Sequence, residues 1–121
     1  MQQEYRLKRR NDFTRVFRAG NSVANRQFVV VMHARKDEGV PRIGVSVSKK
    51  VGKAVVRNRV KRLVKEAMRQ WTSYLKPQTD FVIIARIPAK EMDYHQVRSS
   101  LYHVLNKGKA FAKKPPHPLS N

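Results

Sequence analysis

The chain has 121 residues, which is enough for one domain with a single core and too few for two. Its 27 Lys and Arg side chains stand against only 8 Asp and Glu, so the formal net charge is +19. Cysteine is absent, which excludes a disulfide scaffold, a thiolate zinc site and a cysteine nucleophile.

The excess positive charge predicts a polyanionic partner. Self-repulsion of this size works against a compact state, whereas neutralising phosphates releases condensed counterions. A membrane binder would instead line an amphipathic helix with Trp, Phe and Leu. The longest apolar runs, residues 28–32 and 81–85, are too short to span a bilayer. We therefore expect a cytoplasmic nucleic-acid-binding protein that does not bind membranes.

The first half of the chain predicts one helix and two strands. Residues 11–20 fit a short helix with Phe13 and Phe17 on one face. Residues 26–34 are rich in β-branched side chains, and residues 42–50 alternate apolar with small side chains, and both patterns are typical of strands. A polar turn separates the two strands, so we expect them to form a hairpin.

The second half predicts a long basic helix, a third strand and a closing helix. The basic helix covers residues 54–71, the strand residues 80–87, and the closing helix residues 92–111. The order α-β-β-α-β-α predicts an α+β fold, a two-layer sandwich of helices on a small mixed sheet. We expect one domain over residues 1–112 and a disordered C-terminal tail over residues 113–121, which is rich in proline.

The basic helix separates an apolar arc from a cationic surface. At 100° per residue, Val56, Val60 and Val64 fall within an arc of about 100° that suits a core. Like charges four residues apart destabilise a helix, and an ordinary solvated face mixes signs, yet Glu66 is the only acid here. The pattern therefore indicates phosphate contacts. The cations of this helix are Arg57, Arg59, Lys61, Arg62, Lys65 and Arg69.

The start of the basic helix also favours an anion. Lys49, Lys50 and Lys53 lie at the positive pole of the helix macrodipole, where cations are unfavourable unless an anion binds. Free amides at a helix start can receive a phosphate. Asn58 adds a donor and an acceptor for a base edge or a 2′-hydroxyl.

Residues 42–69, RIGVSVSKKVGKAVVRNRVKRLVKEAMR, closely resemble the signature of the bacterial ribonuclease P protein subunit. The resemblance extends to NDFTRVFRAG, SVANRQFVVV, DFVIIAR and the closing helix, and covers about residues 5–112. Its most specific part is Arg57-Asn58-Arg59 followed by Lys61 and Arg62, because a basic helix alone is a weak signal.

The resemblance implies both a fold and a function. The implied fold has a left-handed βαβ crossover, against the general rule for such units. The implied partners are a large catalytic RNA and the 5′ leader of precursor tRNA, which that RNA removes, and no protein partner is implied. The RNA hydrolyses the phosphodiester with Mg²⁺, which is bound mainly by the RNA. The protein binds the leader and stabilises the catalytic RNA.

Two groups of residues are assigned by this resemblance. The surface for the catalytic RNA would comprise Lys53, Arg57, Asn58, Arg59, Lys61, Arg62, Lys65 and Arg69. The cleft for the leader would comprise Phe13, Phe17, Val29, Val31 and Arg86.

The aromatic residues of the first helix have two interpretations. Phe13 and Phe17 share one face, which is typical of core residues and also of a platform on which single-stranded RNA bases stack. Some relatives carry an aromatic residue where this chain has Val31, so a base would stack less firmly here.

The sequence shows no catalytic constellation of its own. Its eight acids form no metal-binding motif, and His33, His95, His103 and His117 are not spaced to converge. We therefore predict no catalytic residue and no metal site in the protein. A structural, ribosomal-type RNA-binding protein would explain the charge equally well. A DNA-binding protein would need base-reading side chains on the basic helix, where only Asn58 qualifies.

Overall fold

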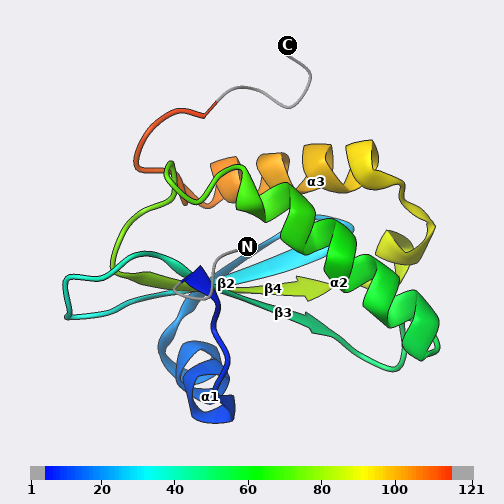
Figure 1. Ribbon diagram of the computed structural model, residues 1–121, viewed down its shortest axis with the longest axis horizontal. Coiled ribbons are helices and arrows are strands. Elements are labelled where there is room, and N and C mark those ends of the chain that lie inside the picture. Colours follow the sequence, from blue (N-terminus) through cyan, green and yellow to red (C-terminus); the bar gives the residue numbers. More distant parts are fainter. Residues whose placement is uncertain (1–4, 116–121) are drawn as a thin grey trace.

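The computed structural model describes residues 5–115 and contains three α-helices on a four-stranded sheet (Figure 1). The observed order is α-β-β-β-α-β-α, which confirms the α+β sandwich and adds one strand to the predicted order. The elements are α1 (Arg10–Ala19), β1 (Asn21–Ala24), β2 (Phe28–Ala34), β3 (Arg42–Val47), α2 (Ala54–Arg69), β4 (Thr79–Ala85), the 3₁₀ helix η2 (Ile87–Glu91) and α3 (Tyr94–Lys107).

The predicted hairpin between residues 26–34 and 42–50, the regions of β2 and β3, is wrong. The sheet has the order β1-β2-β4-β3, so β4 lies between β2 and β3. β4 pairs antiparallel with β2 and parallel with β3. Its sequence TDFVIIA is a nearly continuous apolar run, which is typical of a central strand covered on both faces. β3, α2 and β4 thus form the βαβ unit to which the family resemblance assigns a left-handed crossover.

A buried ionic network holds the loop that connects β2 to β3 across the end of β4. Asp80, which is fully buried, accepts hydrogen bonds from Arg35 Nη1 at 2.7 Å and from Arg42 Nε at 2.8 Å. The hydrogen bond with Asp80 raises the pKa of Arg42 above its ordinary value. The Arg35 amide also donates to the carbonyl of Gln78 at 2.6 Å. These contacts replace the tight turn that a hairpin would have used.

The sheet carries a different core on each face. On one face, Phe28, Phe81 and Ile83 pack with buried residues of α2 and α3. On the other face, Val31 and Val82 pack with α1. Figure 1 shows α2 and α3 on one side of the sheet and α1 on the other. Within residues 5–115, no helix is long and apolar enough to cross a membrane.

The short strand β1 was not predicted, because NSVA is brief and half polar. It is an edge strand that pairs antiparallel with β2. The Asn25 side chain forms the turn between them, since its Oδ1 accepts the amides of Gln27 and Phe28. The register of β2 is therefore fixed by this turn and by β4.

The closing helix is shorter than the predicted range of residues 92–111. Asp93 caps α3 in a capping box with Gln96, and the helix ends at Lys107. Ordered contacts continue into the predicted tail, because the amide of Lys113 donates to the carbonyl of Tyr74 at 3.2 Å. The remainder of that tail, residues 116–121, lies outside the described residues.

Candidate RNA-binding surfaces

Helix α2 buries one side against the sheet and turns its cations outward. Val60, Val64 and Met68 are buried in the core, whereas Asn58 and Arg62 are exposed. We define the cationic surface as the side chains on the outer side of α2. It comprises Asn58, Lys61, Arg62 and Lys65. Arg57, also predicted for this surface, lies on the side of Val64 and Met68, and its Nε atom is buried.

A shallow hollow of about 330 Å³ lies on this cationic surface, between Asn58, Lys61, Arg62, Lys65 and Glu66. Burial lowers the pKa of Lys65, and the positive charges of Arg6 and Lys61 lower it further. The free protein therefore holds Lys65 in an environment that disfavours its charged form. A phosphate in this hollow would relieve that repulsion.

Arg59 stands apart from the other cations of α2. Its Nη2 donates to the carbonyl of Met92 at 3.1 Å, and its Nη1 lies 3.4 Å from the carbonyl of Lys90. Arg59 thus ties α2 to the segment between η2 and α3. Sequence periodicity placed it on the outer face but could not identify these partners, which come from residues more than 30 positions away.

Arg69 is paired within its own helix. Its Nη2 lies 2.5 Å from Oε1 of Glu66, and both side chains are about half exposed. Glu66 therefore offsets part of the positive charge of Arg69 near the end of α2.

The start of α2 is cationic and has no side-chain cap. Lys53 occupies the N-cap position without a side-chain hydrogen bond, and the first turn contains no acid. Lys49, Lys50 and Lys53 are all exposed. The dipole and the three ammonium groups are all positive at this end, and its preference for an anion stays a prediction.

The residues predicted for the leader lie on the α1 side of the sheet, except Arg86, which follows β4. Val31 is buried and Val29 half-buried, both in the small cluster with Phe13. Phe17 is 49% exposed, although it is a large apolar side chain. The two aromatic residues thus differ, because Phe13 packs on the sheet while Phe17 remains accessible. We call Phe13, Phe17 and Val29 the leader surface; Val31, also predicted for the leader, is buried and offers a bound strand almost no contact area.

Gly44 makes room for the ring of Phe13. A Cβ atom added at Gly44 would lie 2.4 Å from Cζ of Phe13, which is far inside van der Waals contact. We expect Gly44→Ala to destabilise the fold by about 1–3 kcal/mol, the usual cost of overpacking. Chemical denaturation measures this loss. The double variant Gly44→Ala with Phe13→Leu should regain most of it, and an unchanged loss in the double variant would contradict the contact.

Arg86 belongs to a separate cationic hollow at the carboxyl ends of β3 and β4. This hollow has a volume of about 610 Å³, and Arg26, Lys50 and Arg86 contribute its cations. Arg86 is held there because its Nη1 donates to the carbonyl of Asn25 at 3.0 Å. Arg26 was not predicted, since the strand pattern around it carried no functional signal.

The described residues contain no cluster of three or more His, Asp or Glu side chains that could hold a metal ion. Several acids already have structural partners. Asp80 is bound by two arginines, and Asp93 caps α3.

Comparison with known proteins identifies relatives across nearly the whole chain. The family model described as Ribonuclease P matches residues 1–109. The Ribonuclease P protein component of Listeria innocua is 47% identical and is aligned over 95% of this chain and 97% of its own length. The protein of the same name from a Geobacillus species is 49% identical, over 93% and 97% respectively.

Solved structures agree with these sequence relatives. The RNase P protein of Staphylococcus aureus superposes with a TM-score of 0.82 at 46% identity, covering 88% of this chain and 97% of that one. The RNase P protein of Thermotoga maritima gives a TM-score of 0.75 at 33% identity, covering 84% and 96%. The fold described above is thus shared with these proteins.

Proposed function

Because the chain belongs to the ribonuclease P protein family, we propose that it binds a catalytic RNA and the 5′ leader of precursor tRNA and so assists removal of the leader. Catalysis would be performed by the RNA, with Mg²⁺ held mainly by the RNA. The protein would act in the bacterial cytoplasm as one component of this endoribonuclease.

The observation that carries the proposal is the separation of two surfaces on opposite sides of one sheet. The cationic surface lies on α2, whereas the leader surface lies beside α1 (Figure 1). A folded RNA can therefore contact α2 while a single strand lies across the other face. Arg and Lys supply the phosphate contacts, and an accessible aromatic ring supplies stacking.

The protein would contribute by neutralising phosphate charge near the cleavage site. In the sequence, Lys53 and its neighbours follow β3 and come immediately before the cations of α2. A precursor tRNA bound to both the catalytic RNA and the protein would be positioned by its protein contacts in addition to its contacts with the catalytic RNA. No side chain of the protein would take part in bond cleavage.

The test is processing of precursor tRNA by a bacterial catalytic RNA at low Mg²⁺, with the protein added or omitted. We expect the protein to raise the cleavage rate strongly at low Mg²⁺ and weakly at high Mg²⁺, because added cations substitute for its charge. Cleavage by the protein alone would overturn the proposal. Binding without any acceleration would favour a structural RNA-binding protein.

Phe17 provides a test of the leader surface. We expect Phe17→Ala to weaken binding of precursor tRNA by roughly 5-fold to 100-fold, because stacking on an aromatic ring contributes about 1–3 kcal/mol per base. Mature tRNA, which lacks the leader, should bind unchanged. The measurement is affinity of the assembled holoenzyme for both RNAs. Equal losses for the two RNAs would assign Phe17 to folding.

A further inference from the structure

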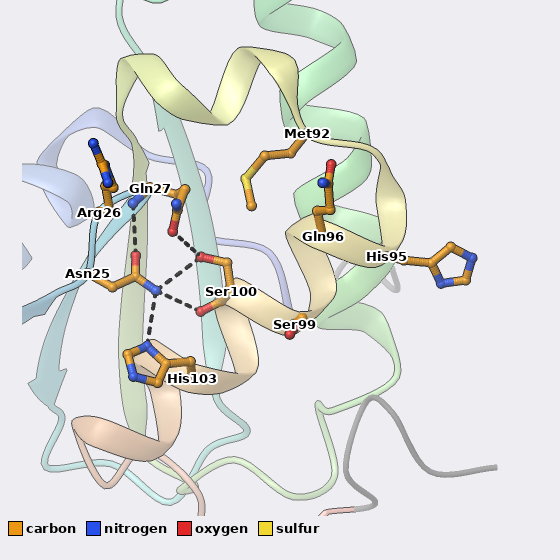
Figure 2. A pocket seen from close by; sticks show the side chains of 9 residues that line it. All are labelled: Asn25, Arg26, Gln27, Met92, His95, Gln96, Ser99, Ser100 and His103. Atoms are coloured by element: carbon orange, nitrogen blue, oxygen red, sulfur yellow. Dashed lines mark hydrogen bonds between the residues drawn. The ribbon is translucent and has the colours of Figure 1, made fainter.

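A third hollow lies outside both surfaces, between α3 and the turn that joins β1 to β2 (Figure 2). Its volume is about 730 Å³, within the range of small-ligand sites. Its lining includes Gln27 from the turn, Met92 before α3, and Gln96 and Ser99 on α3. Figure 2 shows the Met92 side chain directed into this space and His95 directed away from it.

One wall of the hollow is held by a hydrogen-bond network centred on Asn25. Asn25 Oδ1 accepts the amides of Gln27 and Phe28, which fixes the orientation of the side-chain amide. Asn25 Nδ2 then donates to the carbonyl of Ser100 at 2.9 Å and approaches Nδ1 of His103 at 3.4 Å. All these contacts are within the protein, so the shape of this wall does not depend on a bound ligand.

The side-chain oxygens of Gln27 and Gln96 already accept hydrogen bonds. Oε1 of Gln27 accepts the Ser100 hydroxyl, and Oε1 of Gln96 accepts the amide of Asp93. Within residues 5–115, the Nε2 amide groups of both glutamines have no protein partner. The shorter bonds of Asn25 Nδ2 run to the carbonyl and the hydroxyl of Ser100, at 2.9 and 3.0 Å.

The lining carries no acid, and Arg26 is its single permanently charged side chain. A phosphate would find fewer cations here than on α2 or beside Arg86. A flat base suits the hollow better, since Met92 offers a polarizable apolar surface and the free amides can donate to ring carbonyls. Guanine, uracil and cytosine present such carbonyl acceptors, whereas adenine presents none.

Two arginines that the sequence predicts for RNA binding border the hollow. Arg59 of α2 donates to the carbonyl of Met92 at one rim, and Arg86 donates to the carbonyl of Asn25 at the other. On this basis, and resting on the proposed function, we propose that the hollow binds one unpaired base of an RNA that carries a ring carbonyl: guanine, uracil or cytosine. Either the catalytic RNA or the precursor could supply that base.

The first experiment probes the free protein with mononucleotides. We expect GMP, UMP and CMP to shift the backbone amide resonances of Gln27, Gln96 and Ser99 at lower concentrations than AMP, whose base has no ring carbonyl. Ser99→Trp, which fills the hollow, should abolish these shifts, whereas Asn106→Trp on the exposed end of α3 should keep them. Shifts that persist in Ser99→Trp, or shifts confined to α2, would overturn the proposal.

The second experiment uses the assembled holoenzyme. Gln96→Glu keeps an acceptor for the capping box but replaces the free donor with a carboxylate. We expect Gln96→Glu and Ser99→Trp to weaken RNA binding roughly fivefold or more, the loss expected for one hydrogen bond. Asn106→Asp controls for the added negative charge. Thermal unfolding of each variant tests whether it keeps the wild-type fold.

The two RNAs form separate arms of that experiment. Weaker assembly of protein with catalytic RNA would place the base in that RNA, and weaker precursor binding after normal assembly would place it in the precursor. Unchanged affinity in both arms would overturn the hollow as a base site. The proposed function would then still stand if wild-type protein accelerates cleavage, so the two failures are distinguishable.

Discussion

Replacing Asp80 by Ala should destabilise the protein by about 3–5 kcal/mol, the usual cost of removing one partner from a buried ion pair. Asp80 is fully buried and binds Arg35 and Arg42 together, with Arg42 contacting both carboxylate oxygens at 2.8 and 2.9 Å. Without it, the largely buried Arg35 would lose its main charged partner. Domains of this size are stable by about 5–15 kcal/mol, so the loss would be a large fraction of the total.

Asp37→Ala is the matched control for this variant. Asp37 also contacts Arg35, at 3.0 Å, but its side chain is 63% exposed. We expect its removal to cost less than about 1 kcal/mol, because exposed ion pairs are screened by water. Urea unfolding midpoints of the two variants provide the comparison. Equal midpoints would show that the β2–β3 loop is held by contacts other than this carboxylate.

The Asp80 network also shows where sequence reasoning about the fold failed. The strand patterns of residues 28–34, 42–47 and 79–85 were visible, because side-chain alternation and apolar runs are local properties. Pairing is not local. The prediction joined neighbouring strands, whereas β4 inserts between β2 and β3 and brings Asp80 opposite Arg42 in the parallel register. No spacing in the sequence encodes that register.

The candidate site was predictable to the extent that it lies on one helix. The positions of Lys61, Arg62 and Lys65 follow from the helical period, and the structure keeps them together at one hollow. The partners of Arg59 and the exposure of Phe17 depend on how other elements pack, so they required the structure. The assignment of these residues to particular RNAs rested on the family resemblance and remains a proposal.

The double variant Lys61→Ala with Arg62→Ala should weaken binding of the catalytic RNA by roughly a hundredfold. Each lost charge-assisted contact is worth about 1.5 kcal/mol, or about tenfold, if the two act independently. The slope of log Kd against log salt concentration should become shallower by the amount expected for the loss of about two phosphate contacts. The holoenzyme should also need more Mg²⁺ for half-maximal cleavage, because fewer phosphates are neutralised by the protein.

Two comparisons separate a local contact from general attraction. Lys36→Ala with Lys113→Ala removes the same charge from exposed positions outside α2, and we expect it to change the affinity far less. An equal loss of affinity in this control variant would mean that RNA binding depends only on the net charge of the protein. Arg59→Ala should differ from both, since its loss of the bond to Met92 would lower the unfolding free energy as well as the affinity. Normal stability with reduced affinity in that variant would instead make Arg59 a direct RNA contact.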